Sequence, residues 1–131
     1  MKGILLVSHG DLAKGMMDTL SLFFGDLSYT DYLCLKKDDN PDQFKEKMIE
    51  KINLLNQGQG VIVVGDLIGG TPLNQAAYVM SQDVMVLGGM NLGMLISLIS
   101  QRANEHIDYK MILDDAKLGI QCLNTLLKGD I

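Results

Sequence analysis

Two residues with reactive side chains follow apolar runs in this chain. His9 comes directly after residues 3 to 8 (GILLVS), and Asp66 comes directly after residues 60 to 65 (GVIVVG). A carboxylate beside an imidazole accepts the N–H of one ring nitrogen and leaves the other nitrogen bare as a nucleophile. The two residue types therefore predict nucleophilic chemistry at His9, provided that the fold brings Asp66 to it.

A glycine-rich loop follows Asp66. Gly69, Gly70 and Thr71 lead into a predicted helix, whose first N–H groups and dipole favour an anion. Glycine allows the backbone to approach a phosphoryl group closely. Gly10 and Asp11 open a second predicted helix after His9. These features predict a phosphoryl group as the anion bound at this site.

Hydrophobic periodicity predicts alternating strands and helices. The predicted strands are residues 3 to 8, 30 to 35, 60 to 65 and 83 to 87. The predicted helices are residues 11 to 24, 41 to 57, 72 to 81, a segment from near Asn91, and 109 to 118. Asp11, Asn40 and Thr71 are the predicted N-caps, and Gly25 is a predicted helix end. The tail from residue 120 fits either a helix or a strand.

This order of elements predicts an α/β fold with an open, doubly wound parallel sheet and helices on both faces. The commonest strand order for a chain of this size is 2-1-3-4. The winding direction then switches between the first and third strands, where ligands bind in such sheets. We therefore expect His9 and Asp66 to meet at this switch, within one domain that covers residues 1 to 131.

Composition excludes several classes of protein. A net charge of −5 argues against nucleic-acid binding. Cys34 and Cys122 form no metal or redox motif, and no metal site is expected. His106 lies in a polar segment that reads as a surface loop. We expect a cytoplasmic protein, because no secretory signal or membrane-spanning run is visible.

Three segments resemble a known family: VSHG at 7 to 10, GDLIGGTPLN at 65 to 74 and VLGGMNLGML at 86 to 95. They are similar to the IIA domain of the mannose-type sugar phosphotransferase system. The resemblance implies that Nε2 of His9 takes a phosphoryl group from the carrier HPr and passes it to a IIB component. Asp66 would hold Nδ1, and Thr71 occupies a hydroxyl position of the motif. Members often carry a hydroxyl residue where this chain has Leu67.

The resemblance also implies a homodimer. Residues 120 to 126 would form an antiparallel strand that is exchanged between subunits. No cofactor is implied, and contact with the membrane would come only through the permease components of the system.

Other functions fit parts of the pattern. A phosphocarrier subunit of a dihydroxyacetone kinase shares the fold and the N-terminal histidine, although the GGTPLN loop favours sugar transport. A non-covalent flavodoxin-like binding module is the alternative of a different class, but the chain has no Trp and only 5% aromatic residues. A hydrolase would need His9 as general base, with Ser8 as the local candidate for a nucleophile.

Overall fold

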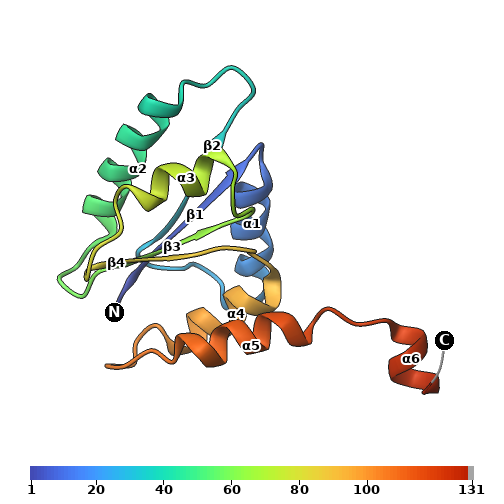
Figure 1. Cartoon of the computed structure of the whole chain (residues 1–131). Helices are drawn as coiled ribbons and strands as arrows, with labels where there is room; N and C mark the ends of the chain where they lie inside the picture. The colour runs from blue at the N-terminus through green and yellow to red at the C-terminus, as the bar shows by residue number, and fades with distance from the viewer. Residues whose placement is uncertain (130–131) are drawn as a thin grey trace. The chain divides into compact units, whose positions relative to one another are not determined.

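Four parallel strands form the sheet, in the order β2-β1-β3-β4 (Figure 1). They are β1 (Gly3–His9), β2 (Thr30–Leu35), β3 (Val61–Gly65) and β4 (Val84–Leu87). The computed structural model describes residues 1 to 129. The central strands β1 and β3 are apolar runs because both of their faces are covered, and all of β3 is buried. The predicted strand order is confirmed.

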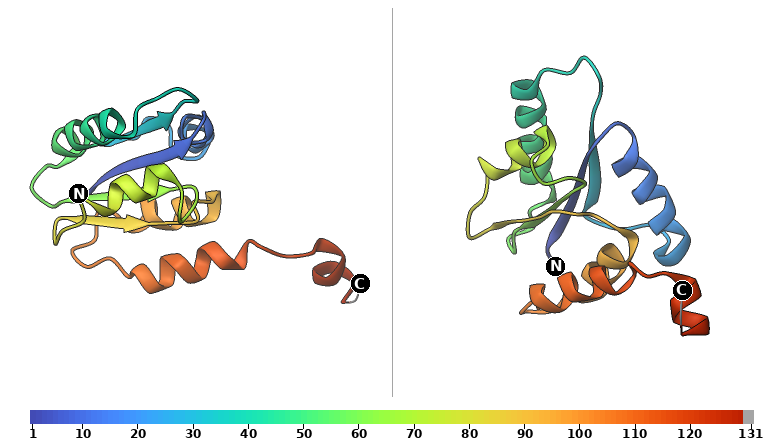
Figure 2. Two further views of the ribbon diagram at one scale, coloured as in Figure 1. Left: turned by 45° about the horizontal axis from the view of Figure 1, so that its top comes forward. Right: turned by 45° about the vertical axis from the view of Figure 1, so that its right-hand side comes forward.

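Three helices cover the sheet within the unit Met1–Met90: α1 (Leu12–Phe24), α2 (Pro41–Leu55) and α3 (Thr71–Ala77). Figure 2 shows α2 and α3 together on one face and α1 on the other. The core under α2 and α3 is built from side chains of the sheet and of these two helices, with β1 contributing Leu5 and Val7. The predicted placement of helices on both faces is confirmed.

The alternation of side chains along β1 decides where the residues at its end point. Odd-numbered residues of this strand, such as Val7, face α2 and α3, and even-numbered residues face the α1 side. His9 therefore turns toward α3, whereas Ser8 turns toward α1. Because successive side chains alternate, the His9 imidazole and the Ser8 hydroxyl point to opposite faces of the sheet.

Of the three predicted N-caps, Asn40 is confirmed, Asp11 holds the cap position without the capping hydrogen bond, and Thr71 is wrong. Asn40 caps α2, because its side chain accepts the N–H groups of Asp42 and Gln43. Asp11 precedes α1 but makes no side-chain cap. Thr71 is the first residue of α3, and Gly70 stands at the cap position without a side chain to contribute. At the start of α1 the Ser8 hydroxyl accepts the Ala13 N–H instead.

A second compact unit begins at Asn91. It holds α4 (Leu92–Gln101), α5 (Tyr109–Leu118) and α6 (Leu123–Lys128). Asn91 caps α4 by accepting the Met94 N–H at 2.9 Å, and its amide donates to the Ala116 carbonyl near the end of α5 at 3.1 Å. One side chain thus joins the beginning of one helix to the end of the other. The expectation of a single domain over residues 1 to 131 stays a prediction.

The tail differs from the strand that the resemblance implies over residues 120 to 126. Leu123–Lys128 form α6, in which the N–H groups of Leu126 and Gly129 donate to the carbonyls of Cys122 and Thr125. A helix satisfies its backbone within the segment, whereas a strand needs a neighbouring strand to do so. The strand is therefore wrong for the tail as described here, and an exchange between subunits stays a prediction. Within residues 1 to 129, no helix combines the length and apolar character that crossing a membrane requires.

Candidate functional site

His9 and Asp66 meet at the carboxyl ends of the neighbouring strands β1 and β3. Val7 of β1 lies in register with Gly65 of β3. The two strands therefore end at the same edge of the sheet, one or two residues after this pair. Nδ1 of His9 lies 2.9 Å from Oδ2 of Asp66. Fifty-seven residues of sequence separate the two side chains, and the parallel register of the strands brings them together.

The carboxylate of Asp66 defines the roles of the two ring nitrogens. A carboxylate only accepts hydrogen bonds, so Nδ1 carries the proton in this contact and Nε2 keeps its lone pair. The imidazole is 45% exposed and the Asp66 side chain only 12%. The bare nitrogen therefore belongs to a ring that a second protein can reach.

Asp66 is itself held by the backbone around it. Oδ2 also accepts the His9 N–H at 3.0 Å, and Oδ1 accepts the Leu67 N–H at 2.9 Å. Burial of Asp66 favours its neutral form, but the hydrogen bonds and charge of His9 and the Leu67 N–H outweigh this and lower the pKa of the carboxyl group. The contact with His9 therefore favours the ionised form of the carboxyl group.

Gly70 forms the wall against which the imidazole lies. A Cβ atom added to Gly70 would lie 2.4 Å from Cε1 and 2.9 Å from Nε2 of His9, closer than a side chain can approach. Gly69 adopts a φ of +91°, a conformation that favours glycine. The Asn74 amide donates to the Gly69 carbonyl at 3.4 Å, and the Asn74 N–H donates to the Gly70 carbonyl at 2.9 Å. The loop that contains Gly69 and Gly70 therefore leaves room for the His9 imidazole.

The amides of two predicted phosphoryl-binding glycines already have partners. The Gly10 N–H donates to the Leu35 carbonyl at 2.8 Å, and the Gly70 N–H donates to the Leu67 carbonyl at 3.2 Å. Gly10 turns the chain with a φ of +55°. In this structure Gly10 and Gly70 therefore shape the site, and their N–H groups do not point into it as donors. Thr71, half-buried at the start of α3, carries the hydroxyl nearest to this loop in the sequence.

Ser8 anchors the segment that carries His9. Its side chain is fully buried, accepts the Ala13 N–H of α1 at 2.7 Å and donates to the Gly10 carbonyl at 3.1 Å. Ser8 thus caps α1 and fixes the turn after His9. Sequence reasoning considered Ser8 only as a nucleophile. A small hydroxyl residue between a buried strand and a helix start was the signal for this structural role.

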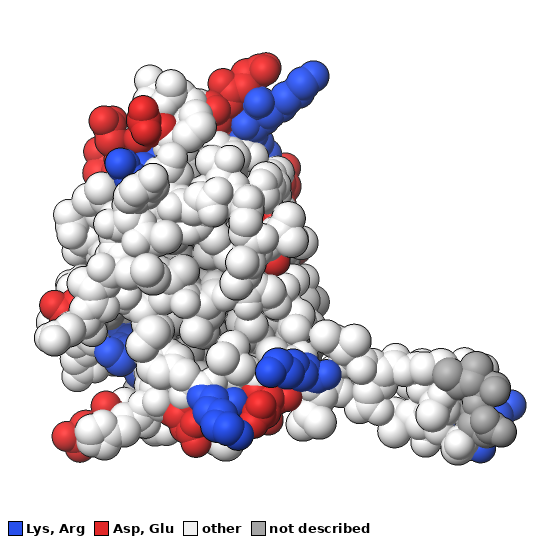
Figure 3. Space-filling view, viewed as in Figure 1, with Lys and Arg blue, Asp and Glu red and all other residues white. Residues whose placement is uncertain are grey.

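Apolar side chains are exposed in the segments that lead away from the site. Leu12, Leu67 and Ile68 are exposed large apolar side chains that belong to the segments following β1 and β3. Ile68 also lies over the glycine turn after β4, because a Cβ atom on Gly88 would lie 2.5 Å from its Cγ1 atom. Figure 3 shows a broad uncharged surface over α3, with charged side chains gathered above it near the loop that joins β2 to α2. Such a surface suits contact with another protein.

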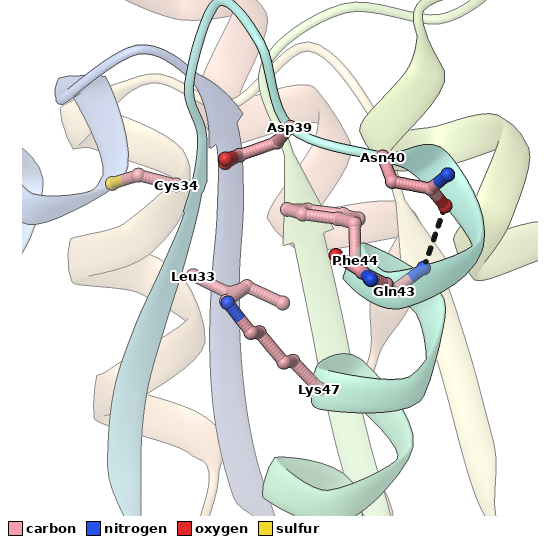
Figure 4. Close-up of a pocket in the computed structure, with 7 residues that line it drawn as sticks. All are labelled: Leu33, Cys34, Asp39, Asn40, Gln43, Phe44 and Lys47. Carbon is pink, nitrogen blue, oxygen red and sulfur yellow. Dashed lines mark hydrogen bonds between the residues drawn. The ribbon is translucent and has the colours of Figure 1, made fainter.

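A small cavity lies beside this edge of the sheet, between β2 and the start of α2 (Figure 4). Its lining includes Leu33, Phe44 and Lys47, and the hydrogen bond from the Gln43 N–H to Asn40 lies at its rim. Neither His9 nor Asp66 lines it. The reactive imidazole therefore lies on an open surface and not inside this cavity. Among residues 1 to 129, no cluster of His, Cys, Asp or Glu side chains is grouped to hold a metal ion.

Comparisons with known proteins match almost the whole chain. A family model described as "PTS system fructose IIA component" (EIIA-man) matches residues 3 to 113. The fructose-specific EIIA component of Bacillus subtilis is 25% identical over 119 residues, which are 89% of this chain and 80% of the relative. The mannose-specific EIIAB component of Escherichia coli K12 is 23% identical over 104 residues, 78% of this chain but only 32% of that longer protein.

Solved structures agree with the sequence matches. The PTS IIA protein associated with the fucose utilization operon of Streptococcus pneumoniae superposes with a TM-score of 0.87 at 30% identity, covering 96% of each chain. The EIIA component of Streptococcus agalactiae superposes with a TM-score of 0.85 at 26% identity, covering 95% of this chain and 99% of that one. The chain therefore belongs to the EIIA-man family, the IIA components of sugar phosphotransferase systems.

Proposed function

We propose that Nε2 of His9 accepts a phosphoryl group from the phosphohistidine of HPr and passes it to a histidine of a IIB component. The observation that carries this proposal is the hydrogen bond from Nδ1 to Asp66 on an imidazole that is otherwise open to a partner. Membership of the family supplies the class of reaction. The sugars named for the relatives differ, so the proposal concerns the phosphoryl step and not the sugar.

The step conserves both charge and protons. The lone pair of Nε2 forms a bond to phosphorus while the donor ring, protonated on its other nitrogen, departs as neutral imidazole with the electron pair of its own N–P bond. The proton on Nδ1 stays there, hydrogen-bonded to Asp66, and the carboxylate stabilises the positive charge that develops on the ring. Transfer between two imidazoles is nearly balanced in energy, so the protein contributes mainly positioning.

The phosphoryl group would lie against the loop that contains Gly69 and Gly70. The Thr71 hydroxyl is the side-chain donor that we assign to its oxygens. Leu67 supplies no hydroxyl, and the Gly10 and Gly70 amides are already bonded within the protein. The group would therefore be held without the N–H groups of Gly10 and Gly70.

Both partners would dock over the exposed imidazole of His9. Leu12, Leu67 and Ile68 expose large apolar side chains in the segments that follow β1 and β3, and a protein that covers these segments would also exclude water from the reacting nitrogen. The same surface can serve donor and acceptor in turn, because both present a single histidine.

We also propose a homodimer in which the tail takes part. Ile120, Leu123 and Leu127 expose large apolar side chains at the end of the chain. A neighbouring subunit would bury them, as the resemblance to the family implies.

We expect one acid-labile phosphoryl group on the protein after incubation with phosphoenolpyruvate, enzyme I and HPr. Intact-mass analysis at alkaline pH measures it. His9→Ala abolishes the label, whereas His106→Ala keeps it, because His106 is an exposed histidine that belongs to the second compact unit. A full label on His9→Ala would contradict the assignment of the acceptor.

Asp66→Asn is expected to lower the rate of phosphoryl transfer by tenfold or more, roughly, because an amide can donate to Nδ1 and drive the proton to Nε2. Rapid-quench kinetics with phosphorylated HPr measures this rate. Asp31→Asn, which alters a carboxylate paired with Lys51 farther back along β2, serves as the matched control. Equal rates for Asp66→Asn and the wild type would remove Asp66 from the mechanism.

Gly70→Ala is expected to slow transfer by about tenfold without unfolding the protein, because the new Cβ displaces the imidazole from Asp66. The φ of Gly70 is −89°, which alanine adopts without strain, so the effect comes from the contact with His9. Gly15→Ala is the control, since nothing lies within 4 Å of a Cβ at that position of α1. An unchanged rate, with circular dichroism showing a native fold, would argue against close packing of the ring on Gly70.

We expect the wild-type protein to sediment at twice the mass of one chain at micromolar concentration. The double substitution Leu123→Asp and Leu127→Asp should shift it to the mass of a single chain, because charged side chains oppose burial of the tail. Analytical ultracentrifugation measures both. A wild-type protein that sediments as one chain would overturn the proposed dimer.

A further inference from the structure

An ion pair lies at the same edge of the sheet as His9. Nζ of Lys36 contacts Oδ1 of Asp11, and both side chains are more than half exposed. Asp11 follows His9 by two residues. Lys36 follows Leu35, which lies in register with His9 and whose carbonyl accepts the Gly10 N–H. The pair therefore spans the ends of β1 and β2 beside the turn that carries the imidazole.

The charges at this edge are unfavourable for an added phosphoryl group. Such a group carries about −1.5 to −2 charges at neutral pH. Asp66 already contributes one negative charge in contact with the ring, and Asp11, two residues along the chain from His9, contributes a second. Lys36 neutralises the second, and its flexible stem lets the ammonium group move when the local charge changes.

We propose that Lys36 and Asp11 form an electrostatic pair that sets the stability of phosphorylated His9, an inference that rests on the proposed function. Lys36 favours the phosphorylated form, and Asp11 opposes it. Phosphorylation draws the Lys36 ammonium group away from Asp11 and toward the phosphoryl charge. The pair thereby sets the balance between accepting the group from the donor and releasing it to the acceptor.

The pair acts through charge and not through contact with the reacting nitrogen. Its contact with Asp11, at the start of α1, places Lys36 on the α1 side of the sheet, whereas the imidazole lies on the α3 side against Gly70. A unit charge about 10 Å from a phosphoryl dianion changes its stability by about fourfold in water, before salt screening. An effect of this size matters for a reaction that is nearly balanced.

The test measures an equilibrium. Each protein is mixed with phosphorylated HPr at low salt, and the phosphorylated fraction of both partners is measured by intact mass at alkaline pH. Docking affinity cancels from an equilibrium between free proteins, so the ratio reports the stability of phosphorylated His9 alone. Lys36→Ala should shift it toward phosphorylated HPr by about twofold to fourfold, and Asp11→Asn should shift it the opposite way by a similar factor.

Three further variants separate this effect from structural ones. The double variant with Lys36→Ala and Asp11→Asn should show an equilibrium ratio of phosphorylated proteins close to that of the wild type. Lys36→Arg should leave this ratio unchanged. Lys51→Ala removes a lysine from a similar pair with Asp31, which lies in register with Leu5, and should leave the ratio unchanged. Raising the salt concentration to 1 M should shrink the Lys36→Ala shift, because charges are then screened within about 3 Å.

The outcomes that overturn the inference differ from those that overturn the proposed function. If the wild-type protein takes no phosphoryl group on His9, both fail. If His9 is phosphorylated and Lys36→Ala leaves the ratio unchanged, only the electrostatic pair is rejected. A shift in the same direction for Lys36→Ala and Asp11→Asn also rejects it, since it would indicate a disturbed turn and not a change of charge.

Discussion

The hydrogen bond between Asp66 and Nδ1 of His9 is the interaction on which the rest of the site depends. It exists because β1 and β3 are parallel neighbours that end at one edge, so that residues far apart in sequence leave the sheet together. The Asp66 carboxylate also accepts two backbone N–H groups, and these orient it toward the ring. The order of the strands thus decides that Nδ1 carries the proton and that Nε2 keeps its lone pair.

The remainder of the site places the imidazole and the turn that carries it. Gly70 presses against the ring, and buried Ser8 fixes the turn that follows His9. The N–H groups of Gly10 and Gly70 nevertheless donate to carbonyl groups within the protein. A site of this kind orients the imidazole ring, and these two amides are not available to an anion bound beside it.

Local patterns in the sequence failed where a hydrogen bond could be satisfied in more than one way. Asp11 has the residue type of an N-cap, but the Ser8 hydroxyl reaches the first turn of α1 from the strand, and Asp11 pairs with Lys36 instead. Thr71 likewise begins α3 without capping it. Asn40 behaved as predicted, because its two acceptor contacts lie within three residues of it along the chain.

The sequence by itself determined the four strands, the α/β order, the two residues at the switch point and the family, because hydrophobic periodicity and short motifs are local properties. The tertiary structure alone decided that the ring lies on Gly70, that two glycine amides are already used, that Ser8 caps α1 and that Leu123–Lys128 are helical. Each of these depends on which groups from distant segments arrive at the same place. A hydrogen-bonding group takes the partner that the packed fold brings nearest, and the order of residues along the chain does not state which one that is.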